Sequence, residues 1–164
     1  MPSPHARRLM RLPAFLLGLA TMLAGQAATA AEPPINTLRN SFFGGRTDTA
    51  INGYDTVAYF TVGKPVKGRD DLVAEWKGAK WKFSTPAHLE LFKGDPEKYA
   101  PQYGGYCAYG VAQGYLVKVE PDQFSVRDGK LYLNYDASVQ ATWAKDPEGY
   151  IKTADGRFDA LLKK

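Results

Sequence analysis

Apolar and polar residues alternate along residues 72–84, and Gly78-Ala79 interrupts the alternation. In the second half of this stretch, Trp81 and Phe83 alternate with lysines. A period of two is typical of a β-strand with one buried face, and a glycine between two such runs is typical of a hairpin turn. The pattern therefore predicts an antiparallel hairpin with Trp81 and Phe83 on its buried side.

A short helix is predicted directly after this hairpin. Ser84 and Thr85 offer hydroxyl groups for an N-cap, and Pro86 suits the first helical turn. Apolar residues then recur at helical spacing as far as Phe92. The helix should end before Pro96, because the residue preceding a proline disfavours helical backbone.

The same plan follows a second time, at an offset of 51 residues. A second hairpin is predicted over residues 123–135 with its turn at Asp128-Gly129, and Asp136 then caps a helix that continues through Trp143. In this alignment Gly78 matches Gly129, Trp81 matches Tyr132, Phe92 matches Trp143, and Asp95-Pro96-Glu97 matches Asp146-Pro147-Glu148. Internal duplication and coincidence both remain open, since Asp-Pro-Glu is a common start of a helix.

The predicted fold class is α+β, a small single domain of short antiparallel hairpins and short helices. Residues 151–162 are expected to add a helix or arm that packs through Phe158 and Leu161. Before the domain, residues 31–50 begin with tandem prolines and show little periodicity, which predicts an extended N-terminal arm. We therefore expect the compact domain to occupy residues 51–164.

Residues 1–30 have the three parts of a secretory signal peptide. Three arginines and no acidic residue precede an apolar stretch, Leu12–Ala24, and Ala28-Thr29-Ala30 supplies the small side chains that signal peptidase requires. At 13 residues and with an internal proline, the apolar stretch is short for a membrane anchor. We expect export, to the periplasm or the medium, and no membrane span after the signal is removed.

Removal of the signal peptide changes the composition. The formal net charge falls from +4 to +1, because the three arginines of the signal are lost. The remaining balance does not favour nucleic acid as a partner. All three methionines also lie in the signal, which excludes a methionine-rich copper site, and the single cysteine excludes an internal disulfide.

Several motifs resemble the YHS domain family. They are Gly53-Tyr54-Asp55-Thr56-Val57-Ala58-Tyr59-Phe60, the run from Trp81 to Tyr99 that ends Phe-x-x-Asp-Pro-x-x-Tyr, Tyr103-Gly104-Gly105-Tyr106-Cys107-Ala108-Tyr109, and Gly129-Lys130-Leu131-Tyr132-Leu133-Asn134-Tyr135. The resemblance covers most of residues 51–160 and is greatest to the exported branch of the family.

The resemblance also bears on metal binding. Metal-binding members of the family are similar to zinc-binding treble-clef modules, and the positions of their cysteines are Ala58, Ser84 and His88 here. A structural zinc site needs four nitrogen or sulfur ligands. The resemblance therefore implies a domain held together by its hydrophobic core instead of by zinc.

Cys107 and His88 are the two soft donors left after removal of the signal. Cys107 lies among glycines and tyrosines, and it is either a buried small apolar residue, a thiolate ligand or a reactive thiol. His88 is either a hydrogen-bonded helix residue or a metal ligand. If the two side chains meet, a Cys–His pair with a third weak donor suits copper better than structural zinc, and the same pair could form a thiolate–imidazolium nucleophile.

The tyrosines around Cys107 also admit two interpretations. Tyr103, Tyr106 and Tyr109 are candidates for an aromatic ligand pocket, and the alternative is that they belong to the core of a small sheet. The sequence contains no phosphate-binding loop, HExxH run or complete catalytic constellation. We therefore expect a binding module rather than an enzyme.

Three functions follow from these residues. The first is an exported YHS-like domain that binds a transition metal, copper first, through Cys107 and His88. The second is a metal-free protein-interaction domain with Cys107 buried in the core. The third is a thiol-dependent enzyme that uses Cys107.

Overall fold

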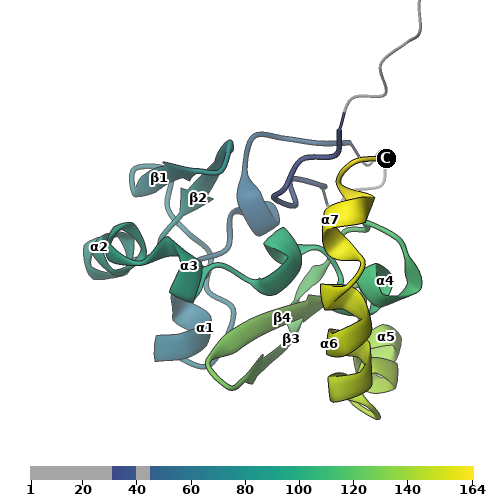
Figure 1. Ribbon diagram of the computed structural model, residues 1–164. Helices are drawn as coiled ribbons and strands as arrows, with labels where there is room; N and C mark the ends of the chain where they lie inside the picture. The colour runs from purple at the N-terminus through teal and green to yellow at the C-terminus, as the bar shows by residue number, and fades with distance from the viewer. Residues whose placement is uncertain (1–30, 40–44) are drawn as a thin grey trace, which may run out of the picture.

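The computed structural model describes residues 31–39 and 45–164, in which one order of elements occurs twice (Figure 1). The predicted signal peptide lies outside the described residues. The first unit contains the 3-10 helix η1 (Ala50–Gly53), α1 (Ala58–Thr61), β1 (Val73–Trp76), β2 (Ala79–Lys82), α2 (Pro86–Gly94) and α3 (Pro96–Tyr99). The second contains η2 (Gln102–Gly105), α4 (Ala108–Gln113), β3 (Glu120–Arg127), β4 (Lys130–Asn134), α5 (Ala137–Trp143) and α6 (Pro147–Asp155), and α7 (Phe158–Leu161) follows.

Both predicted hairpins are confirmed. Strands β1 and β2 pair antiparallel, as do β3 and β4, and each pair forms a separate two-stranded sheet. The turns have the same geometry, with positive φ at Lys77 and Gly78 and again at Asp128 and Gly129. Two successive residues in this region define the type I′ turn, which favours Asn, Asp or Gly. The turn chemistry thus fixes both hairpins locally.

The helix caps predicted from the sequence are also present. Thr85 Oγ1 accepts the backbone N–H of His88 at 3.2 Å, and Asp136 Oδ1 accepts that of Val139 at 2.8 Å. Helix α2 begins at Pro86 and ends at Gly94, before Pro96 as expected. These side-chain acceptors satisfy backbone donors that a helix leaves free in its first turn.

The repeated order of elements keeps its register along the chain. Strands β2 and β4 begin 51 residues apart, as do helices α2 and α5 and helices α3 and α6. The 3-10 helices precede them in the same way, and each contains two successive residues with left-handed backbone. This agreement between equivalent elements supports internal duplication of a hairpin–helix unit.

The core consists of two clusters that meet at β4. Leu131 and Leu133 pack in the first cluster with Trp81, while Tyr132 packs in the second with Trp143. The alternation of apolar and polar residues predicted that this strand has one buried face and one solvent-exposed face. That prediction is wrong for β4, whose residues 131–134 are all buried, because the strand lies between the two clusters. In Figure 1, β1, β2 and α2 lie to one side of the second hairpin, and α6 and α7 lie to the other.

The N-terminal arm is part of the packed structure. Ile35 is 2% exposed and belongs to the first core cluster, and Asn36 Nδ2 donates to the carbonyl of Gly105 at 2.8 Å. Gly104 has a φ of +61°, and a Cβ at this position would lie 1.8 Å from the carbonyl oxygen of Pro34. Only glycine fits this approach. The core therefore extends beyond the boundary at residue 51 that the sequence indicated.

The C-terminal segment forms the expected helical structure. Helix α6 ends at Asp155, and α7 places the buried side chain of Leu161 in the second core cluster. Among the described residues, no helix combines the length and the apolar character that crossing a bilayer requires.

Candidate functional site

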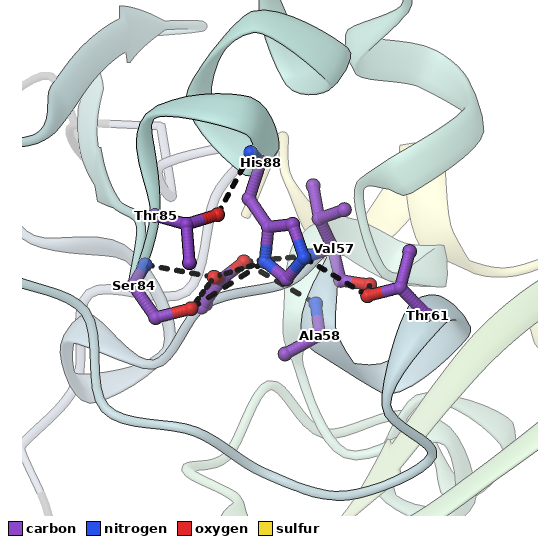
Figure 2. Close-up of polar contacts among 7 residues, drawn as sticks. Val57, Ala58, Thr61, Ser84, Thr85 and His88 are labelled. Atoms are coloured by element: carbon purple, nitrogen blue, oxygen red, sulfur yellow. Dashed lines mark hydrogen bonds and ion pairs between the residues drawn. The ribbon is translucent and has the colours of Figure 1, made fainter.

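A buried carboxylate organises the polar cluster in Figure 2. The side chain of Asp55 is fully buried just before α1, where Oδ1 accepts the backbone N–H of Val57 at 2.9 Å and of Ala58 at 3.3 Å. Oδ2 accepts the backbone N–H of Ser84 at 2.8 Å and its hydroxyl at 2.5 Å. A buried charge needs such compensation, and Asp55 thereby ties the start of α1 to the end of the first hairpin.

His88 supplies the fifth contact to this carboxylate. Its Nδ1 lies 2.6 Å from Asp55 Oδ2, and its side chain is 12% exposed. On the other edge of the ring, Nε2 lies 3.1 Å from the hydroxyl of Thr61, the last residue of α1 (Figure 2). A carboxylate beside Nδ1 requires a proton on that nitrogen, which in a neutral imidazole leaves the lone pair on Nε2.

Orientation of this kind limits what the imidazole can do. A metal-binding histidine commonly donates its second ring N–H to a carboxylate, as His88 does to Asp55. The same pair also resembles the base and orienting acid of a hydrolase. However, the hydroxyl of Thr61 also lies 3.1 Å from the carbonyl oxygen of Val57, one helical turn earlier, which it can reach only as a donor. Thr61 therefore has a structural partner that competes with a role as nucleophile.

Cys107 lies in a second, separate polar cluster. Its side chain is buried at 1% exposure, where Sγ accepts the N–H of Gly110 at 3.3 Å and contacts Asn134 Oδ1 at 3.5 Å. Burial raises the pKa of the Cys107 thiol, against the opposing effect of nearby backbone N–H groups. A buried, hydrogen-bonded thiol with a raised pKa has the character of a small core residue.

The buried thiol should react slowly in the folded protein. At pH 8 the raised pKa lowers the thiolate fraction below that of free cysteine, and burial blocks access of the reagent. We expect an aromatic disulfide reagent to modify native Cys107 about two orders of magnitude more slowly than the chain unfolded in guanidinium. Stopped-flow absorbance measures both rates, and equal rates would contradict the assignment of Cys107 to the core.

Asp55 and Cys107 occupy equivalent positions in the two units. Each follows Gly-Tyr after a 3-10 helix and precedes a short α-helix, at an offset of 52 residues. Asp55 accepts the backbone N–H of Ser84, and Cys107 lies within reach of the N–H of Tyr135, which is 51 residues further on. The position equivalent to His88 in the second unit is Val139. His88 thus pairs within the first unit, with the counterpart of Cys107.

The predicted Cys107–His88 pair has no shared partner in the described part of the chain. The side chain of His88 contacts Asp55, Ser84 and Thr61, whereas Sγ of Cys107 contacts Gly110 and Asn134 and lies within reach of the N–H of Tyr135. Within residues 31–39 and 45–164, no group of three or more His, Cys, Asp or Glu side chains is placed to hold a metal ion. The copper site therefore stays a prediction, without a third donor of these types.

The three candidate tyrosines contact different groups. Tyr103 donates to Asp155 Oδ1 at 2.8 Å, and burial together with this carboxylate raises its pKa. Tyr106 donates to the carbonyl of Pro33 and so fixes the arm. The ring of Tyr109 packs edge-on against that of Tyr150, with 5.1 Å between the centroids. Tyr103 also lines a surface cavity.

The sequence interpretation assigned no role to three residues of these clusters, Asp55, Thr61 and Asn134. An aspartate two residues before the apolar run from Val57 is a signal for an N-cap. This signal could have identified Asp55 as an acceptor for backbone N–H groups at the start of α1. Its pairing with His88, 33 residues away, has no local signature. The positions that the YHS resemblance indicated, Ala58, Ser84 and His88, all contact Asp55.

Comparison with known proteins identifies no relative. No family model, no curated protein and no solved structure matches the chain significantly. The resemblance to YHS domains therefore rests on the sequence motifs alone.

Proposed function

We propose that this protein is an exported, YHS-like binding domain that works without a metal and contacts a protein partner. The observation that carries the proposal is the state of Cys107, which is buried, hydrogen-bonded and raised in pKa. A thiol in this state is a poor nucleophile and a poor metal ligand, since both roles need the thiolate. This favours the metal-free domain over the thiol-dependent enzyme.

An exposed apolar groove supports a protein partner. It lies along α2 and α3, has a volume of about 600 Å³, and is lined by Leu91, which is 42% exposed. Exposed Ala87 adds to the apolar lining, Tyr99 is only 7% exposed, and the charged residues of the lining are Glu90, Asp95 and Lys98. Exposed apolar side chains beside charged ones are typical of a protein interface.

Site-specific photo-crosslinking in the native host tests this proposal. A photoreactive amino acid at Leu91 is expected to give one discrete adduct with a protein, because Leu91 lies in the groove. Val126 on β3 is a matched control, since it is 41% exposed and lies outside the groove. No adduct from position 91, or the same adducts from both positions, would count against the groove as a contact surface.

Copper binding remains a second candidate, favoured by the orientation of His88. Asp55 holds Nδ1, so a metal would bind Nε2 in place of its contact with the Thr61 hydroxyl. In this candidate Cys107 and His88 both bind the ion. Calorimetric titration with Cu(I) and Cu(II) separates the two functions. Stoichiometric binding that Cys107→Ser abolishes and His88→Ala weakens supports copper, and its absence supports the metal-free domain.

A further inference from the structure

A cavity of about 320 Å³ lies between the N-terminal arm, the turn of the first hairpin, η2 and α7. Its size falls within the range of small-molecule sites. Three aromatic side chains line it, Trp76, Tyr103 and Phe158, and the rings of Tyr103 and Phe158 are in contact at 5.7 Å between centroids. Because the arm is anchored by buried residues, the walls of the cavity are preformed.

Charged groups in this cavity already show how a cation is held. The ammonium of Lys77 lies 4.3 Å from the centroid of the Trp76 ring and 2.8 Å from Glu97 Oε1. An aromatic face and a carboxylate together form a binding site for cations. Asp159 adds a second carboxylate to the lining, so acidic groups outnumber Lys77 by one.

The ammonium group of Lys77 is only weakly bound in this cavity. Lys77 lies in the hairpin turn with a φ of +48°, and its side chain is 45% exposed. Exposed ion pairs contribute little to stability because water screens them. The ammonium of Lys77 can therefore move into solvent at small cost and leave Trp76 and Glu97 free for another cation.

We propose that this cavity binds a small organic cation with an apolar body, an alkyl- or arylammonium ion. Its charge takes the place of the Lys77 ammonium against Trp76 and Glu97. Its apolar body occupies the space beside Tyr103 and Phe158. The site is separate from the polar cluster of His88 and from the groove on α2, and the proposal does not depend on the function of either.

Three ligands of similar shape and different charge test the proposal by NMR titration of the full chain. Phenethylammonium is expected to shift the indole N–H of Trp76 and to bind at least about tenfold more tightly than 2-phenylethanol. The anion 3-phenylpropionate is expected to bind more weakly still, because two carboxylates face the cavity. Equal affinity for the ammonium and the alcohol, or no shift of Trp76 at millimolar ligand, would overturn the proposal.

Substitutions of the two charged residues are expected to change the affinity for phenethylammonium in opposite directions. Lys77→Asn removes the competing cation and introduces a residue that favours the turn, so it should tighten phenethylammonium binding by about two- to threefold. Glu97→Gln should weaken binding by about two- to fivefold, because this carboxylate is itself 73% exposed. Lys98→Ala is the control, because its ammonium lies over the Tyr99 ring outside this cavity, and it should leave binding unchanged. Weaker binding by the Lys77→Asn variant would overturn the proposal.

Discussion

Replacement of Trp81 by alanine is expected to lower the free energy of unfolding by about 3–5 kcal/mol. The side chain is 1% exposed and its ring contacts those of Trp76 and Phe92, at 5.8 and 5.2 Å between centroids. Truncation leaves a large cavity in a close-packed cluster, which the surrounding backbone of β2 can fill only in part. Urea denaturation followed by circular dichroism measures the change.

An exposed aromatic residue provides the control for this measurement. Tyr115 is 66% exposed, so Tyr115→Ala should change stability by no more than about 0.5 kcal/mol. A loss below about 1 kcal/mol for Trp81→Ala would show that the buried face of the first hairpin is wrongly assigned.

The second large loss of folding stability is expected on replacement of Asp55. Asp55→Ala removes the acceptor of backbone N–H groups from Val57, Ala58 and Ser84 and leaves His88 without its carboxylate. Removal of one partner from a buried polar pair costs about 3–5 kcal/mol, because the remaining groups stay buried and unpaired. Chemical denaturation of the variant gives this loss directly.

An exposed carboxylate in an ion pair is the matched control for Asp55. Asp70 contacts Lys82 at 2.5 Å, and its side chain is 92% exposed, so Asp70→Ala should leave stability nearly unchanged. A double-mutant cycle with His88→Gln then isolates the coupling between His88 and Asp55. Equal losses for Asp55→Ala and Asp70→Ala would mean that the Asp55 cluster contributes little to the fold.

Local signals account for most of what the sequence predicted correctly. The turn glycines Gly78 and Gly129 and the caps Thr85 and Asp136 act within a few residues, so each hairpin and each following helix could be located without knowledge of the rest. The repeat of these signals at one offset also gave the repeated order of elements.

Contacts between distant segments were not predictable in the same way. The burial of Ile35 depends on Gly104, and the burial of Tyr132 depends on the second core cluster. The hydrogen bond from His88 to Asp55 likewise joins two elements that only tertiary packing brings together. These features follow from where one unit lies against the other, and a pattern of one strand or one helix carries no information about that placement.

The anchored arm brings two distant parts of the chain side by side. The backbone N–H of Glu32 donates to the carbonyl of Leu162 at 3.0 Å, so the arm and the end of α7 are in contact. A short linker between them would span this gap without disturbing either segment. New ends opened at Gly63, where the chain is exposed and a Cβ would meet no neighbour, would then give a circularly permuted protein. In such a protein β1, β2, α2 and α3 come first, the second unit follows, and the arm, η1 and α1 come last, so the first unit is assembled from both ends of the chain.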